Sequence, residues 1–108
     1  REIWGHAATD DETLQGMKAI HERFGYISDP HTAVGVLGWE AYKRGHSEPA
    51  QGLVLATAHP AKFADVVMRA IGTAPPLPDR LAAYLSRDKL SLPMSSSYDD
   101  FKQFLLDR

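Results

Sequence analysis

The chain has 108 residues, of which 44% are hydrophobic and 24% are charged, as in an ordinary globular domain. Its net charge of −2 provides no basic field that would attract nucleic acid, and no apolar run approaches the roughly 18 residues of a membrane span. The absence of cysteine excludes disulfides, thiolate metal sites and cysteine nucleophiles, and it fits a reducing, cytoplasmic location.

The first predicted element is an amphipathic helix over residues 10–24. Thr9 and Glu12 have the spacing of a capping box, with a hydroxyl at the N-cap and a carboxylate three residues later. Gly25 stands where a glycine commonly ends a helix. Between these signals lies an apolar stripe at helical spacing, made of Leu14, Met17, Ile20 and Phe24.

A short strand is predicted at residues 26–28, followed by a helix over about residues 30–44. The Asp-Pro pair at 29–30 is typical of a helix start, with aspartate at the N-cap and proline at the first helical position. Gly35 and Gly38 lie on one face of this helix and leave a flat stripe that another segment can approach closely. The surrounding positions are apolar, so we expect a buried helix.

Residues 53–56 form a continuous apolar run of strand length, typical of a strand that is covered on both faces in a parallel sheet. A polar turn follows, and proline then opens a helix over residues 60–71 with apolar positions at helical spacing. A proline-rich connector leads into residues 73–108. That part of the chain should be helical, with helices over residues 79–86 and after Ser97.

The order strand, helix, strand, helix over residues 26–71 predicts a βαβα unit with parallel strands. Two strands are marginal as a sheet, and so apolar a strand needs neighbours. We therefore expect a helix-rich α/β fold in which this unit belongs to a larger parallel sheet and residues 73–108 form a helical extension. Because the chain starts at Arg1 without a methionine, we expect residues 1–108 to be a single fragment whose partner is the remainder of the same polypeptide.

Ligands collect at the carboxyl ends of parallel strands, and two polar segments, residues 28–32 and 56–60, should meet at that edge. The candidate site residues there are Asp29, Thr57, His59 and Lys62. Each also has a purely structural explanation, since Asp29 can cap a helix, Thr57 can close a turn and Lys62 can be a solvated lysine. A cation in the first turn of a helix is electrostatically unfavourable, however, and hints at an anionic partner.

Other chemistries have weaker support. His31 and His59 could hold a metal with Asp29, but their spacing is not that of a metal site, so we predict none. A hydrolase built on histidine, aspartate and a hydroxyl residue lacks the G-x-S-x-G motif. The sequence also lacks the glycine-rich motifs of dinucleotide and P-loop sites.

Residues 26–35 (YISDPHTAVG) and 55–63 (LATAHPAKF) together resemble the C-terminal part of the threonine synthases, a family of fold-type II pyridoxal-phosphate enzymes. The similarity extends to residues 8–13 and 75–78, so the resemblance runs from about residue 7 to the end of the chain. It implies a PLP-dependent carbon–oxygen lyase of amino-acid biosynthesis. That enzyme would convert O-phosphohomoserine and water into threonine and phosphate.

The resemblance also implies residue roles. Thr57 would hydrogen-bond the pyridine nitrogen of the cofactor, and a neutral hydroxyl there leaves that nitrogen largely unprotonated. Asp29 would lie beside the cofactor ring, while His59 and Lys62 would lie near the site without an assigned role.

The reactive centre itself is expected elsewhere in such an enzyme. The Schiff-base lysine and the loop that holds the cofactor phosphate belong to the N-terminal portion of the family, so no catalytic residue is predicted here and the isolated chain should be inactive. None of the chain's lysines sits in a Schiff-base motif; they are Lys18, Lys43, Lys62, Lys89 and Lys102. The alternative is a free-standing α/β binding or interaction module that has kept this fold without catalysis.

Overall fold

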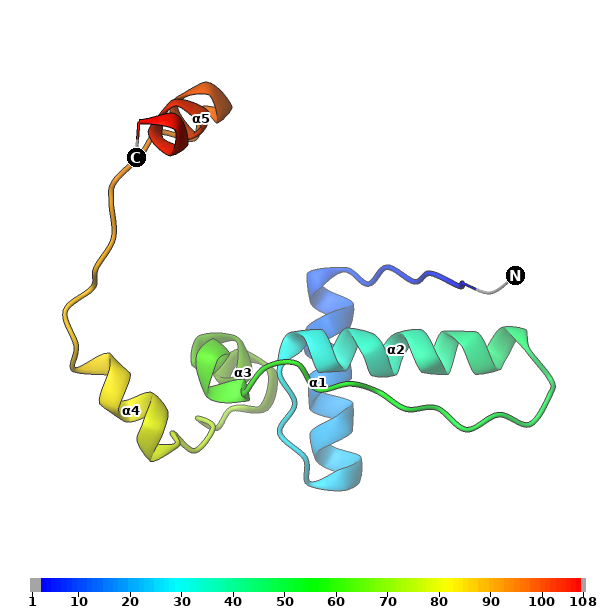
Figure 1. Cartoon of the computed structure of the whole chain (residues 1–108). Coiled ribbons are helices and arrows are strands. Elements are labelled where there is room, and N and C mark those ends of the chain that lie inside the picture. The colour runs from blue at the N-terminus through cyan, green and yellow to red at the C-terminus, as the bar shows by residue number, and fades with distance from the viewer. Residues whose placement is uncertain (1–2, 108) are drawn as a thin grey trace. The chain divides into compact units, whose positions relative to one another are not determined.

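The computed structural model describes residues 3–107, and its regular elements are all helices (Figure 1). They are α1 (Asp10–Phe24), α2 (Pro30–Gly45), the 3-10 helix η1 (Pro60–Phe63), α3 (Ala64–Ile71), α4 (Asp79–Leu85) and α5 (Tyr98–Leu106). The chain divides into two compact units, Arg1–Pro78 and Asp79–Arg108. Within residues 3–107, no helix is both long and apolar enough to cross a membrane.

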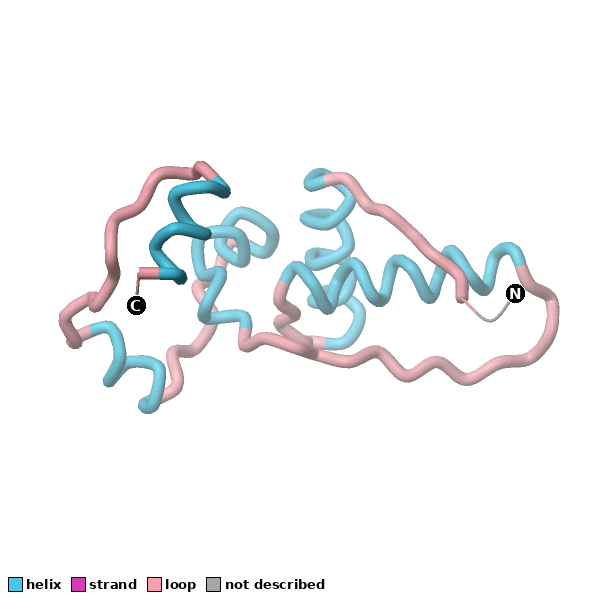
Figure 2. The backbone as a smooth tube through the Cα atoms, turned by 45° about the horizontal axis from the view of Figure 1, so that its top comes forward, coloured by secondary structure: helices cyan, strands magenta, loops and turns pink. Residues whose placement is uncertain are grey.

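The predicted βαβα unit is wrong for this chain. None of residues 3–107 lies in a strand, and the segments expected to be strands are drawn as loop in Figure 2. A strand exists only where its backbone N–H and C=O groups pair with those of a neighbouring strand, and no such pairing occurs among these residues. The apolar run is also not buried, since Leu53 is 88% and Leu55 is 72% exposed. Its composition suits a sheet interior, but composition alone does not supply neighbours.

The signals at both ends of α1 are confirmed. The Thr9 backbone N–H donates to Glu12 Oε2 at 2.7 Å, and the Glu12 N–H donates back to Thr9 Oγ1 at 3.3 Å. The hydrogen bonds from the Thr9 backbone and hydroxyl lower the pKa of Glu12. At the other end Gly25 has a φ of 65°, and its N–H donates to the carbonyl of His21 at 2.8 Å.

The core of the first unit lies where α1 packs against α2 and α3. The buried apolar side chains are Met17 and Ile20 of α1, Ala33 of α2 and Val67 of α3. Helices α1 and α2 approach closely, because a Cβ atom added at Gly16 would lie 3.0 Å from Leu37. This core fixes the N-terminal end of α2 beside α3.

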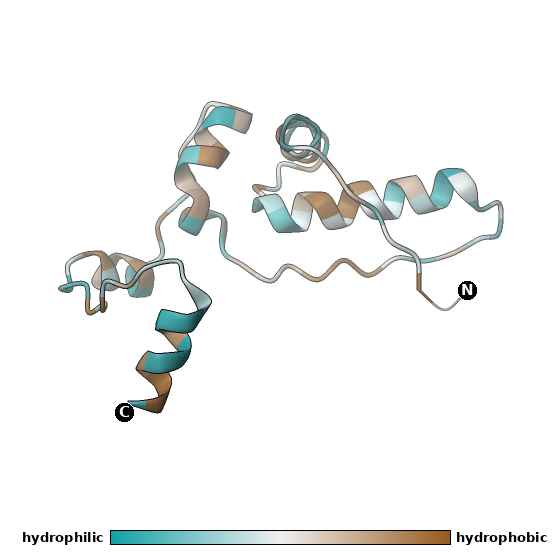
Figure 3. Ribbon diagram, turned by 90° about the horizontal axis from the view of Figure 1, so that it is seen from above, coloured by the Kyte–Doolittle hydropathy of each residue, from teal (hydrophilic) through white to brown (hydrophobic). Residues whose placement is uncertain are grey.

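The remainder of α2 is less covered than its composition suggests. Thr32 is the other buried residue of this helix besides Ala33, so the expectation of a buried helix holds only for its first turn. Figure 3 shows apolar residues gathered in the middle of α2. The extended segment before η1 runs along α2 (Figures 1 and 2), and a Cβ atom at Gly35 would lie 3.0 Å from Val54. The same segment leaves no room for a side chain at Gly52, where a Cβ atom would lie 2.5 Å from the Trp39 ring.

The second unit contains the two C-terminal helices, α4 and α5, as the sequence predicts. Ser97 caps α5, since its hydroxyl accepts the N–H of Asp100 at 3.4 Å. Leu92, Met94 and Phe101 line a shallow hollow within this unit, and each remains at least 41% exposed.

Candidate functional site

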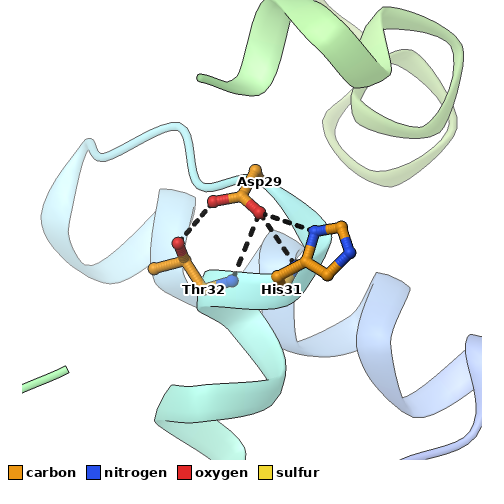
Figure 4. A network of polar contacts seen from close by, with 3 residues as sticks. All are labelled: Asp29, His31 and Thr32. Atoms are coloured by element: carbon orange, nitrogen blue, oxygen red, sulfur yellow. Dashed lines mark hydrogen bonds and ion pairs between the residues drawn. The ribbon is translucent and has the colours of Figure 1, made fainter. Parts of the chain in front are cut away.

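The turn that opens α2 is built around a buried carboxylate (Figure 4). Asp29 is 1% exposed, and its Oδ1 atom accepts the backbone N–H of His31 at 3.0 Å and that of Thr32 at 3.4 Å. His31 Nδ1 lies 3.1 Å from the same oxygen, and the Thr32 hydroxyl donates to Oδ2. The N-cap predicted from the sequence is confirmed, and the contacts of this carboxylate lie within the first turn of its own helix.

These contacts decide the charge of Asp29. Burial alone would raise the pKa of the carboxyl group, because the charged form loses hydration. The hydrogen bonds from Thr32 and His31 outweigh that effect and lower the pKa below its usual range. Asp29 is therefore an anion at neutral pH, placed where the N–H groups at a helix N-terminus favour negative charge.

The ring of His31 extends this cluster toward the next turn. Its side chain is 63% exposed, and its ring centroid lies 5.1 Å from that of Phe63 with the two planes tilted by 58°. Phe63 is the last residue of η1. The two polar turns are thus close in space, as the sequence predicts, although a ring contact and not a pair of parallel strands brings them together.

A hollow of about 670 Å³ opens beside the second turn. Tyr26 and Ile27 line it together with Thr57 and His59. Thr57 is exposed, and among residues 3–107 no side chain or backbone group forms a hydrogen bond with its hydroxyl. That hydroxyl is therefore available to a ligand in the hollow.

His59 has a structural role that the sequence did not reveal. Its Nδ1 atom accepts the backbone N–H of Ala61 at 3.2 Å, so the imidazole caps η1. Its carbonyl accepts the N–H of Lys62 at 3.0 Å. Histidine is not among the preferred N-cap residues, so only its position directly before Pro60 could have signalled this role. Because Nδ1 accepts a hydrogen bond, the proton of the neutral ring is on Nε2.

The four predicted site residues separate into two groups. Thr57 and His59 share the hollow, whereas its described lining includes neither Asp29 nor Lys62. Lys62 is exposed in η1. Ser28 is a further candidate that received no role from the sequence: it is 2% exposed, and its hydroxyl has no hydrogen-bond partner among the described residues. A buried serine directly before an N-cap aspartate is visible in the sequence, but its burial is not.

Comparison with known proteins gives this geometry a context. Residues 32–105, more than half of the chain, match the family described as "Threonine synthase, C-terminal". The chain belongs to the threonine synthase family. It is 36% identical over 111 residues to threonine synthase of Serratia marcescens and 38% identical over 84 residues to that of Pseudomonas aeruginosa. These alignments cover 98% and 77% of the chain, respectively.

A solved structure supports the same assignment. The chain is similar to the PLP-bound threonine synthase from Brucella melitensis, with a TM-score of 0.63 and 33% sequence identity over 91% of this chain. The chain spans 25% of the Serratia threonine synthase, 18% of the Pseudomonas one and 20% of the Brucella one. The resemblance recognised in the two polar segments is therefore confirmed at the level of the family and of its C-terminal region.

Proposed function

We propose that this chain works as the C-terminal part of a cytoplasmic, fold-type II threonine synthase, a lyase that converts O-phosphohomoserine and water into threonine and phosphate. The observation that carries the proposal is the Thr57 hydroxyl, which lies in a hollow and has no hydrogen-bond partner among residues 3–107, in a chain that belongs to this family. The remainder of the polypeptide would supply the lysine that attaches pyridoxal phosphate and the loop that binds its phosphate.

The residues of the hollow fit one edge of a pyridine ring. Such a ring is flat and largely apolar, and it carries one nitrogen at its edge. The hollow offers the side chains of Tyr26 and Ile27 together with the neutral hydroxyl of Thr57, which has no hydrogen-bond partner among residues 3–107. When bound, pyridoxal phosphate supplies the electron sink of the reaction. The Thr57 hydroxyl would donate its hydrogen to the ring nitrogen while remaining neutral, and would therefore not stabilise a protonated ring as a carboxylate does.

Asp29 and Lys62 enter this proposal differently. The resemblance places Asp29 beside the cofactor ring, yet its carboxylate is already occupied by the first turn of α2. We therefore assign Asp29 a positioning role. Lys62 is exposed in the helix that follows the hollow, where its cation can interact with an anionic substrate.

The test replaces Thr57 in the full-length protein. Thr57→Ala removes one hydrogen bond to the cofactor and should lower kcat/KM by about 3- to 10-fold, the equivalent of one hydrogen bond between neutral groups. Thr57→Ser keeps the hydroxyl and is the matched control, with activity near that of the wild type. Phosphate release from O-phosphohomoserine measures the rate, and the absorbance of bound pyridoxal phosphate reports the state of its ring.

Two results would count against the proposal. An unchanged rate and absorbance in Thr57→Ala would remove Thr57 from the site. A full-length wild type that neither binds pyridoxal phosphate nor releases phosphate would favour the alternative of a non-catalytic binding module. The isolated chain mixed with pyridoxal phosphate should not show the absorbance of a cofactor bound to a lysine in either case, because no lysine lines the described hollow.

A further inference from the structure

We propose that Asp29, His31 and Phe63 form a positioning cluster that holds the turn of residues 57–59 in place and thereby fixes the Thr57 hydroxyl. The proposal deepens the function proposed for Thr57 and rests on it. It assigns Asp29 a structural effect on the site in place of direct contact with the ligand, and it gives roles to His31 and Phe63.

The first step is the hold of Asp29 on His31. The carboxylate is 1% exposed, and its Oδ1 atom lies 3.0 Å from the backbone nitrogen and 3.1 Å from Nδ1 of His31. The ring of His31 is thus attached to the Asp29 carboxylate through Nδ1, next to the backbone N–H that the same oxygen accepts, although most of the side chain is open to solvent. An exposed histidine without such contacts would sample several rotamers.

The second step is the contact between the His31 and Phe63 rings. Their centroids are 5.1 Å apart with a tilt of 58°, within the range of favourable aromatic pairs. The two residues are 32 positions apart in the sequence and lie on different helices, α2 and η1. The contact therefore sets the position of η1 relative to the first turn of α2.

The third step leads from η1 to Thr57 through a stiff turn. The His59 ring accepts the N–H of Ala61 and its carbonyl accepts that of Lys62, while the ring of Pro60 fixes its own φ. These constraints span the residues between Phe63 and Ala58. A shift of Phe63 is consequently passed along this turn to His59, which a single residue, Ala58, separates from Thr57.

The experiment uses the full-length protein and asks first about the turn itself, in the absence of cofactor. Phe63→Leu and His31→Asn should each raise the hydrogen-exchange rate of the Ala61 and Lys62 amides, whose N–H groups are bonded to His59, by about 3- to 10-fold, the equivalent of one aromatic pair. Phe24→Leu and His46→Asn make the same chemical changes at exposed positions outside the cluster, and they should leave this exchange unchanged. Phe63→Tyr keeps the aromatic ring and should restore wild-type exchange.

A second readout connects the turn to Thr57. With pyridoxal phosphate bound, the absorbance of Phe63→Leu should shift in the same direction as that of Thr57→Ala. The shift of the double variant, which carries both substitutions, should be smaller than the sum of the two single shifts. Wild-type exchange in both cluster variants would overturn the proposal. Faster exchange with unchanged absorbance would also overturn it, because the cluster would then stabilise the turn without positioning Thr57.

The proposed function is tested separately, by measurements on the wild-type protein alone. A wild-type protein that binds no cofactor and releases no phosphate refutes that function before any variant is compared. The exchange measurement needs no cofactor, so it still decides whether the positioning cluster holds the turn.

Discussion

The turns that open α2 and η1 share a sequence pattern but differ in how they use it. Each places a cap residue directly before a proline, Asp29 before Pro30 and His59 before Pro60. Asp29 is buried and engages two backbone N–H groups and two side chains. His59 is exposed and accepts one N–H through its ring.

This difference separates stability from ligand binding. The first turn satisfies the Asp29 carboxylate internally, so this group contributes to the fold and offers little to a ligand. The second turn leaves the Thr57 hydroxyl without a partner in the described chain and places it in an open hollow. Substitutions at the first turn should therefore act mainly on stability, and those at the second mainly on the cofactor.

The largest expected effect on stability is that of Asp29→Ala. Removing this N-cap leaves the N–H groups of His31 and Thr32 unsatisfied and should cost about 2 kcal/mol, the upper end for cap deletions. Hydrogen exchange in the full-length protein measures it as a lower free energy of local opening at the start of α2. Asp29→Asn is the control, since its amide oxygen can still accept one N–H. A loss below about 0.5 kcal/mol, the few tenths typical of a weak cap, would contradict the special role given to this turn.

The same carboxylate should make the first turn sensitive to acid. The pKa of Asp29 is lowered in the folded chain, so its stabilising effect is fully present above the ordinary carboxyl pKa of about 4. It is lost as the pH falls through the lower pKa of the folded state. The opening free energy at the start of α2, measured between about pH 2 and 6, should fall over that window.

Asp29→Asn again provides the comparison, because an amide does not titrate. Its opening free energy should show a smaller decrease over the same pH window. Parallel curves for the wild type and Asp29→Asn would mean that another group causes the acid sensitivity.

What the sequence predicts correctly is the local structure of the helices. The capping box at Thr9, the N-cap at Asp29 and the C-terminal glycines at 25 and 72 all depend on contacts within about four residues. Such signals do not require the rest of a fold, and they place most helix ends within one or two residues of those observed. The exception is the helix predicted over residues 60–71, whose first turn is the 3-10 helix η1 and whose α-helical part, α3, begins at Ala64.

The strands show the opposite case. The run at residues 53–56 has the composition of a sheet interior, but pairing depends on backbone groups from distant parts of a chain. The sequence predicts that the two polar turns lie close together, but it bases this on parallel strands that do not form among residues 3–107. The contact between the His31 and Phe63 rings, which joins the two regions, is not signalled by any local pattern. The order of the elements made Thr57 one of several candidates, and only the resemblance to a family gave it a specific role, since a lone threonine in a turn carries no specific signal.

The smallest expected effect is that of the His59 cap. His59→Ala removes the acceptor for the Ala61 N–H and should lower the opening free energy of η1 by about 1 kcal/mol, a typical value for one cap. His59→Asn should retain most of that stability, because asparagine is a preferred cap and can accept the same N–H. Hydrogen exchange of the Ala61 amide measures the effect directly.

If both variants lose as much stability as Asp29→Ala does, the second turn is as dependent on its cap as the first, and the contrast between the two turns fails. If only His59→Ala loses stability, by less than Asp29→Ala does, the imidazole serves η1 as a replaceable acceptor. The cofactor absorbance of His59→Asn would then show whether the Nε2–H of the histidine has a further part in the hollow.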